Sequence, residues 1–210
     1  MRLFLPAVVI VAILAYLARR FLGGRACTPV PPHVARFLDG RLRHAVQPPR
    51  RIVERSKIAK GMCVLEVGCG NGAVAAPAAR AVGDGGSVYG LDIQQQMLDL
   101  FKRKLQKPEN GDIRNVRLVA GDACVLPFCS DSFDAVYVVE ALGEVHDPDK
   151  ALVEMKRVLK PGGILAVTEF FIDPHYSRRP AMAKRCAAAG LILSATAGSF
   201  WNYTLTFRKA

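Results

Sequence analysis

VLEVGCGNG, residues 64–72, places an apolar run and one acid directly before three glycines at alternate positions. Glycine lacks a Cβ atom, so such a segment lets the backbone turn tightly and approach a ligand closely. In parallel sheets, ligands bind where the strands end. The stretch therefore predicts a strand followed by a ligand-binding loop, although a purely structural turn has the same composition.

From Gly61 onward, strand-like apolar runs alternate with segments of helical periodicity, which predicts an α/β fold with a largely parallel sheet. Residues 191–197 and 200–207 are joined by a Gly-containing turn and predict an antiparallel hairpin at the sheet edge. Lys160-Pro161-Gly162-Gly163 predicts a sharp turn that closes the preceding helix. The other predicted strands are Cys63–Val67, Ser87–Leu91, Val116–Val119, Ala135–Val139 and Ile164–Phe170, and the predicted helices are Ala76–Val82, Gln94–Gln106, Asp149–Leu159 and Arg179–Ala189.

Acidic residues follow several of these strands. Asp92 ends the second strand, 24 positions after Gly68, where a carboxylate can accept hydrogen bonds from ribose hydroxyls. NAD-binding proteins use the same arrangement, and a helix N-cap role would also explain Asp92. Asp122 follows the third strand, where it could accept a bond from the exocyclic amine of a base, and Glu140 follows the fourth.

Five stretches at consistent spacing carry a more specific pattern: VLEVGCGNG (64–72), GLDI (90–93), GDACVLPF (121–128), SFDAVYVVEAL (132–142) and ALVEMKRVLKPGG (151–163). Together they resemble the class I methyltransferases that depend on S-adenosylmethionine (SAM), and the chain looks most like the small UbiE-like members. Some of those methylate quinones and other lipid-soluble acceptors. The G-x-G-x-x-G pattern of dehydrogenases fits less well, because residue 73 is Ala. The resemblance implies a Rossmann-like sheet over residues 61–210, with SAM as the cofactor.

The resemblance also implies roles for individual residues. Glu66 would support the loop and the methionine amino group, Asp92 would bind the ribose, and Asp122 would bind the adenine amino group. Glu140 would meet the sulfonium end. The positions expected to contact SAM are Glu66, Gly68, Cys69, Gly70, Asp92, Ile93, Asp122, Ala123 and Glu140.

The candidates for acid–base chemistry lie after the fourth strand. Many relatives carry a His pair where this chain has Gly143-Glu144, and His146 stands where Pro is usual. A general base is needed only if the acceptor loses a proton, and Glu144 and His146 are the candidates, with a solvated surface loop as the alternative. If either acts as the base, replacing it should reduce turnover before it weakens SAM binding.

Other polar residues give no comparable signal. We assign His175 a surface role, and the spacing of His and Cys residues predicts no metal site. The six cysteines include no CxxC pair and are expected to be reduced thiols. Aromatic residues near the ends of the last strands could line an acceptor pocket or belong to the ordinary core; they are Phe170, Phe171, Tyr176, Trp201 and Tyr203.

The N-terminal part of the chain differs in character from the rest. Leu3–Ala18 is an uncharged apolar run, about 24 Å long as a helix. Arg19-Arg20 follow it directly and argue against a cleaved signal peptide. Residues 1–60 hold 12 Lys and Arg against 2 Asp and Glu, so nearly all of the net charge of +11 lies there. This pattern predicts a membrane anchor helix in residues 1–22, followed in residues 23–60 by a basic linker with lid helices, one of them from Arg51 to Ala59.

These observations lead to one expected function and two alternatives. We expect a SAM-dependent methyltransferase that acts on a small, hydrophobic or lipid-like acceptor at the membrane, with its catalytic domain in the cytoplasm. No nucleic-acid partner is expected, because the body of the chain is nearly neutral. The alternatives are a soluble metabolite or thiol as acceptor, and a tethered module that binds SAM without turnover. The sequence does not indicate the oligomeric state.

Overall fold

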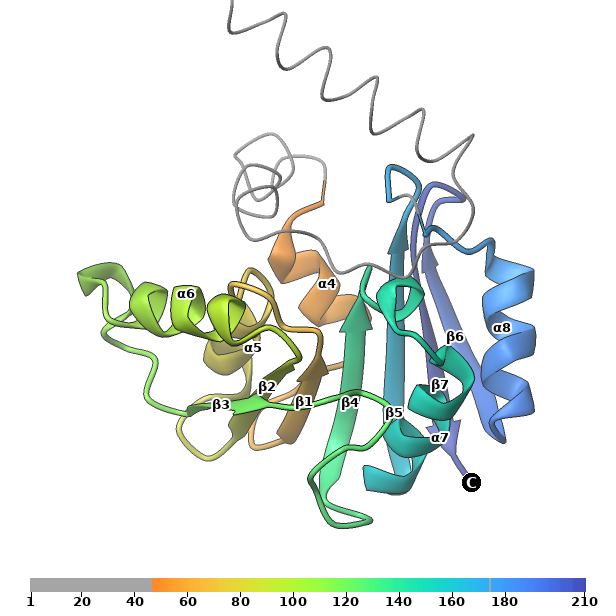
Figure 1. The fold of residues 1–210 in the computed structure, drawn as a ribbon, viewed down its shortest axis with the longest axis horizontal. Coiled ribbons are helices and arrows are strands. Elements are labelled where there is room, and N and C mark those ends of the chain that lie inside the picture. Colours follow the sequence, from red (N-terminus) through yellow and green to blue (C-terminus); the bar gives the residue numbers. More distant parts are fainter. Residues whose placement is uncertain (1–46, 174) are drawn as a thin grey trace, which may run out of the picture.

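The computed structural model describes residues 47–173 and 175–210, which form an α/β fold around a seven-stranded sheet (Figure 1). The predicted anchor, residues 1–22, and the part of the predicted linker before residue 47 lie outside the described residues. The strand order is β3-β2-β1-β4-β5-β7-β6. The strands are β1 (Cys63–Val67), β2 (Ser87–Asp92), β3 (Val116–Ala120), β4 (Phe133–Val139), β5 (Leu159–Phe170), β6 (Leu191–Gly198) and β7 (Asn202–Lys209).

Strands β1 to β5 pair in parallel, and β7 is antiparallel to both β5 and β6, so the C-terminal hairpin is antiparallel as the sequence predicts. Strand β7 pairs with β5 on one side and with β6 on the other, so the C-terminal hairpin extends the sheet with β6 at its edge. The carboxyl ends of the parallel strands therefore meet at one edge, the upper one in Figure 1. We call this the carboxyl edge.

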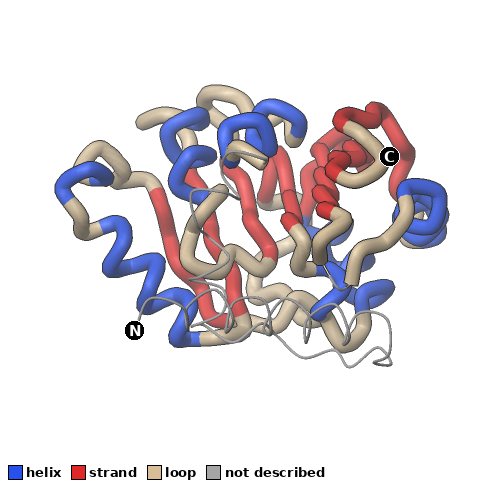
Figure 2. Tube along the Cα trace, turned by 90° about the horizontal axis from the view of Figure 1, so that it is seen from above, coloured by secondary structure: helices blue, strands red, loops and turns tan. Residues whose placement is uncertain are grey.

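Helices cover both faces of the sheet (Figure 2). On one face, apolar side chains of α7 (Pro148–Val158) and α8 (Arg179–Ala188) pack on the sheet. The other face is covered by α4 (Pro49–Arg55), α5 (Ala75–Val82) and α6 (Gln95–Leu105). Two short 3-10 helices, η1 (Pro108–Asn110) and η2 (Leu142–Glu144), lie in the connections. Burial of these two apolar layers is the main force that holds the fold together.

Two predicted boundaries are wrong for identifiable reasons. The segment Lys160–Gly163 lies inside β5 instead of before it, because β4 and β5 already pair at Phe133 and Leu159 and resume pairing at Ala135 and Ile164. The intervening residues form a bulge, tied to Asp134 by the Lys160 ammonium at 2.6 Å. Helix α4 ends at Arg55 and does not continue to Ala59, because Lys57 has a φ of 59°.

Two further findings bear on the sequence predictions. Within residues 47–173 and 175–210, no helix combines the length and apolar character needed to cross a membrane. The five cysteines in this part of the chain are all free thiols, as expected.

Candidate active site

The glycine-rich loop after β1 is fixed by backbone hydrogen bonds to the end of β2. The N–H groups of Gly68 and Cys69 donate to the Leu91 carbonyl at 2.8 and 3.0 Å. Gly68 has a φ of 72°, and a Cβ there would lie 2.5 Å from the Ala141 Cβ, so only glycine fits between β1 and the loop after β4. At Gly70, also with positive φ, a Cβ would meet nothing within 4 Å. The loop therefore presents open backbone at the carboxyl edge.

Asp92 joins this loop to the start of α6. Its carboxylate accepts the Gly70 N–H at 2.8 Å and the Gln94 N–H at 2.9 Å. Burial raises the pKa of Asp92, and these hydrogen bonds oppose the shift. The next residue, Ile93, is a large apolar side chain left 61% exposed. Asp92 thus shapes the loop beside an exposed apolar side chain, and the ribose and adenine contacts expected of Asp92 and Ile93 stay predictions.

Glu66 is the buried acid of the site, only 2% exposed on β1. The Tyr137 hydroxyl on neighbouring β4 donates to its carboxylate at 3.0 Å. Burial raises the pKa of Glu66 to about 8, while the Tyr137 hydrogen bond acts in the opposite direction. A carboxyl group in this state becomes easier to ionise when a cationic amine approaches, as the expected methionine amino group would.

The loop after β3 brings three of the expected residues together. Asp122 accepts the Cys124 N–H at 2.8 Å, and Ala123 is buried beside them. The imidazole Nδ1 of His146 lies 4.0 Å from an Asp122 oxygen and 3.9 Å from the Cys124 sulfur. The structure therefore places His146, one of the two predicted bases, beside the acid expected to bind adenine.

Asp122, Cys124 and His146 also form a group of possible metal ligands, since their ligand atoms lie within 4.8 Å of one another. The Cys124 thiol, however, donates to the Asp147 carbonyl at 3.3 Å, and burial raises its pKa. Both the Asp122 carboxylate and the Cys124 thiol thus have protein partners without an ion. The absence of a metal remains a prediction.

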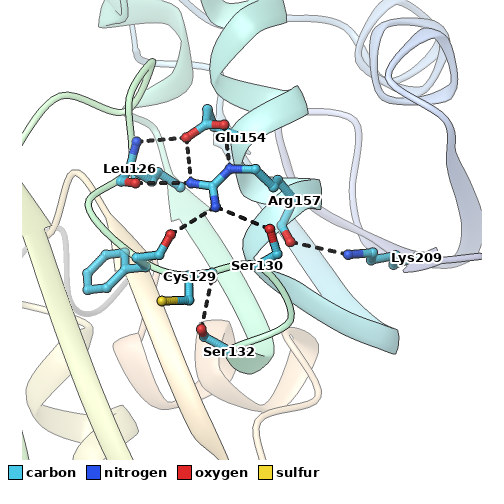
Figure 3. A network of polar contacts seen from close by, with 8 residues as sticks. Leu126, Cys129, Ser130, Ser132, Glu154, Arg157 and Lys209 are labelled. Atoms are coloured by element: carbon cyan, nitrogen blue, oxygen red, sulfur yellow. Dashed lines mark hydrogen bonds and ion pairs between the residues drawn. The ribbon is translucent and has the colours of Figure 1, made fainter.

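Arg157 on α7 holds the far end of this loop in place (Figure 3). Its guanidinium donates to the carbonyls of Leu126 at 3.0 Å and Phe128 at 2.8 Å, and it pairs with Glu154 at 2.7 Å. Glu154 in turn accepts the Leu126 N–H at 2.9 Å. An Arg and a Glu of α7 therefore hold the loop that carries Asp122, and the sequence analysis did not predict this contact.

The connection after β4 passes the end of β5. Glu140 adopts a φ of 56°, and its N–H donates to the Thr168 carbonyl at 2.9 Å. Gly143, in η2, packs so tightly against His175 that a Cβ would lie 2.3 Å from the His175 Cβ. The surface role predicted for His175 is therefore wrong, because its side chain is only 19% exposed. Glu144, the other predicted base, lies in the same η2 turn.

The predicted aromatic residues do gather at the carboxyl edge of β5. The rings of Phe170 and Trp201 lie 5.8 Å apart, those of Phe171 and Tyr176 5.4 Å, and those of Tyr176 and Tyr203 5.9 Å. Tyr203 is fully buried, so it belongs to the core. Toward solvent, four large apolar side chains are 39–75% exposed, and we call them the apolar rim: Phe171, Ile172, Phe200 and Trp201.

Comparisons with known proteins agree with this geometry. The family model "Methyltransferase domain" matches residues 65–167, from β1 through most of β5. That segment is therefore similar to a methyltransferase domain.

Among curated relatives of the domain, demethylmenaquinone methyltransferase of Staphylococcus aureus is 42% identical over 120 residues, which cover 57% of this chain and 48% of the relative. Ubiquinone/menaquinone biosynthesis C-methyltransferase UbiE of a Marinomonas species is 40% identical over 121 residues, covering 58% and 47%. The match thus spans about half the length of these relatives. A SAM-dependent methyltransferase of Aquifex aeolicus has the same fold, with a TM-score of 0.78 and 21% identity over 87% of this chain and all of that one.

The cofactor of the methyltransferase domain is SAM, and the residues present fit it. The open backbone at Gly70 leaves room for a ligand, Glu66 and Asp92 supply acids for an amine and a diol, and Ile93 offers an apolar surface for a ring. The contacts predicted for each residue remain predictions.

Proposed function

We propose that this protein transfers the methyl group of SAM to a small lipophilic acceptor of the quinone type. The observation that carries the proposal is the apolar rim, which lies at the same edge of the sheet as the SAM loop. Trp201 and Phe171 come from neighbouring strand ends, and the Phe171 N–H donates to the Trp201 carbonyl at 2.6 Å. Clustered, solvent-facing apolar side chains beside a cofactor loop suit an acceptor that is itself apolar. The names of the two quinone-biosynthesis relatives support the same class of acceptor.

Bound SAM supplies a methyl group on a sulfonium, which is a good leaving group, so the chain's residues have mainly to bind and align. Glu66 would hold the amine end of SAM, Asp92 its ribose, and Asp122 with Ala123 its adenine. Glu140, at the end of β4, lies on the side of the site that faces β5. The acceptor would enter between this strand end and the apolar rim.

We also propose that the protein works at a membrane surface, facing the cytoplasm. The support comes from the sequence of residues 1–60, with its uncharged run at Leu3–Ala18 and its concentration of Lys and Arg. An apolar acceptor dissolved in the bilayer would reach a tethered enzyme without passing through water. The apolar rim, exposed beside the site, is suited to that approach.

The decisive experiment incubates the purified full chain with methyl-labelled SAM and a total membrane extract kept under reducing conditions, and then partitions the label between organic and aqueous phases. A parallel sample contains soluble thiols and metabolites instead of the extract. An Asp92→Ala variant serves as the control that cannot bind SAM normally. Binding of SAM to each protein is measured separately by calorimetry.

Label in the organic phase that is absent with Asp92→Ala would support the proposal and supply the product for identification by mass spectrometry. Label confined to the aqueous phase of the second sample would replace it with methylation of a soluble acceptor. SAM binding without any labelled product from either source would point to a module that binds SAM without turnover.

A further inference from the structure

The connection between β6 and β7 is a short, closed turn at the carboxyl edge (Figure 1). Strand β6 ends at Gly198 and β7 begins at Asn202, and the Ser199 N–H donates to the Asn202 carbonyl at 2.8 Å. We call residues 198–202 the hairpin tip. It carries two members of the apolar rim, Phe200 at 75% and Trp201 at 39% exposure. Because the turn is already closed, these side chains can enter an apolar phase at a small cost in conformational entropy.

The backbone carbonyls beside these two side chains already have donors within the protein. The Phe200 carbonyl accepts the Tyr176 hydroxyl, and the Trp201 carbonyl accepts the Phe171 N–H at 2.6 Å. A carbonyl that leaves water without a donor costs free energy, which is why exposed loops seldom enter lipid. The hairpin tip avoids this cost at Phe200 and Trp201.

Two guanidinium groups converge on the hairpin tip from opposite faces of the sheet. Arg179, the first residue of α8, donates to the Gly198 carbonyl at 2.6 Å. Arg55, the last residue of α4, donates to the Asn202 side-chain oxygen at 3.1 Å. It also lies so close to Gly198 that a Cβ there would be 2.9 Å from an Arg55 nitrogen. Since α8 and α4 pack on different faces, the aromatic side chains are flanked by a cation from each face.

These positive charges have little local compensation. Within residues 47–173 and 175–210, no ion pair includes Arg55 or Arg179. The groove beside Arg55 is lined by one acid, Glu54, and by a further cation, Lys57. The first turn of α8 contains no acid, and Arg178 is exposed just before it. Cations around an apolar tip complement a surface that has anionic phosphates outside and hydrocarbon beneath.

We propose that the hairpin tip docks this protein on an anionic phospholipid bilayer, with Phe200 and Trp201 in the interface and Arg55 and Arg179 on lipid phosphates. Tryptophan settles at the boundary between headgroups and hydrocarbon. Each guanidinium has five N–H donors, and its contact with the tip leaves donors for a phosphate.

The inference rests on the proposed membrane location and deepens it, because it names the lipid class and the residues in contact. The hairpin tip lies at the same edge of the sheet as the glycine-rich loop. A docked tip would therefore turn the entrance for the acceptor toward the bilayer.

The first test measures the fluorescence emission of Trp201, which reports on the hairpin tip because the chain has a single tryptophan. The purified full chain is added to vesicles of phosphatidylcholine alone, or of phosphatidylcholine and phosphatidylglycerol in equal parts, at low ionic strength. The emission should shift to shorter wavelength mainly with the anionic vesicles, and added salt should reverse the shift. Vesicle binding through another part of the chain would not by itself produce this shift. An equal shift with both kinds of vesicle, or none with either, would overturn the inference.

Variants test the two arginines. Arg55→Gln and Arg179→Gln should each lower the ratio of docked to undocked tip on anionic vesicles about fivefold, the contribution of one basic residue near a charged surface. Arg55→Lys and Arg179→Lys should keep most of the docking, because they keep the charge. Arg117→Gln is the matched control, since its guanidinium lies 5.4 Å from the centroid of the Tyr89 ring at the other end of the sheet. Arg179 makes the same contact with the Tyr203 ring.

Unfolding midpoints establish that each variant is folded. Docking by both Gln variants that equals docking by wild type would overturn the role of the arginines and with it the inference.

Further samples separate other partners from the bilayer. A shift with heparin equal to that with anionic vesicles would overturn the lipid assignment in favour of polyanions in general. A shift on concentrating the protein without vesicles would overturn it in favour of contact with a second copy of the chain.

A methylation assay separates this inference from the proposed function. It uses a demethylmenaquinol dispersed in neutral detergent, so that no anionic bilayer is needed. Methylation by a protein whose hairpin tip does not respond to anionic vesicles would overturn the inference and leave the proposed acceptor intact. A tip that docks on anionic vesicles, in a protein that does not methylate the quinol, would retain the docking surface and exclude this acceptor.

Discussion

At the scale of single residues, the buried carboxyls make the fold sensitive to pH. Glu66 and Glu169 both have a pKa of about 8, raised by burial, and each lies among apolar neighbours. The unfolded chain releases these two protons near the ordinary pKa of glutamate, whereas the folded chain retains them. Stability from this source is therefore fully present below about pH 4.5 and is lost as the pH rises through about 8.

The Glu66→Gln variant should lose less stability than wild type between pH 5 and pH 8, by an amount on the order of 2 kcal/mol. Urea unfolding of the SAM-free protein at both pH values would measure the difference. The control is Glu109→Gln, at a side chain that is 66% exposed. An identical decline in wild type and Glu66→Gln would mean that Glu66 is already ionised in the folded protein.

His146 offers a second prediction at this scale. Its side chain is 64% exposed and lies near Asp122, so its removal should disturb the adenine end of the site more than the methyl end. We expect His146→Ala to raise the Kd for SAM by about two- to fivefold, the range of an exposed ion pair, and to change kcat less. Calorimetry and steady-state kinetics separate the two effects. A large fall in kcat at unchanged SAM affinity would instead favour the role of base predicted from the sequence.

At the scale of elements, the glycine-rich loop and α6 depend on each other. Gly72 has a φ of 74°, and a Cβ there would lie 2.1–2.4 Å from the buried ring of Phe101. Gly72→Ala should therefore destabilise the protein by about 2–4 kcal/mol, through backbone strain and overpacking. Gly85→Ala is the matched control, because its Cβ would meet nothing within 4 Å and its φ is not positive. Equal unfolding midpoints for the two variants would contradict the packing described here.

Arg157 provides a test of how the loop after β3 is held. Arg157→Met would leave the Glu154 carboxylate and the carbonyls of Leu126 and Phe128 without their shared donor. We expect a loss of about 2 kcal/mol in the free energy of unfolding, together with weaker SAM binding. Arg185→Met, which breaks only an exposed pair with Asp149, should cost less than about 1 kcal/mol. Comparable losses of unfolding free energy in both variants would show that the Arg157 contacts stabilise the protein no more than an exposed ion pair does.

The elements that were predicted well are those whose signal is local. Strand β1 agrees with the prediction at both ends, because Cys63–Val67 is a short apolar run that stops at a glycine. Helix α5 begins at Ala75, one residue before the predicted Ala76, and Pro77 lies in its first turn, where proline is tolerated.

The features that were missed depend on residues far apart in the chain. The bulge at Lys160–Gly163 requires Asp134 across the sheet, and the burial of His175 requires Gly143. The ordered run of acids and glycines thus predicted the loops that follow the strands, while the SAM contacts of their residues stay predictions. The acceptor side could not be predicted from local sequence patterns, because it forms where turns from distant parts of the chain meet.

At the scale of the whole molecule, contact between the apolar rim and a bilayer can be measured by tryptophan fluorescence. The chain contains a single tryptophan, and Trp201 of the rim is 39% exposed. If the protein works with its carboxyl edge toward a bilayer, vesicles containing brominated phosphatidylcholine should quench the Trp201 fluorescence. The quenching of Trp201 should be weaker in Phe200→Ser, because this variant lacks the most exposed side chain of the rim. Protein that floats with the vesicles but keeps its full fluorescence would show that the rim faces away from the lipid.

The position of β7 between β5 and β6 has a consequence for how this protein is made. Strand β7 is synthesised after every other strand, yet it occupies an interior place in the sheet, and its Lys209 side chain donates to the carbonyls of Arg157 and Leu159. During synthesis, the edges of β5 and β6 that pair with β7 therefore stay unpaired until β7 leaves the ribosome. The apolar run at Leu3–Ala18 emerges long before that moment. Under the proposed membrane location, targeting of the nascent chain would then precede completion of the sheet.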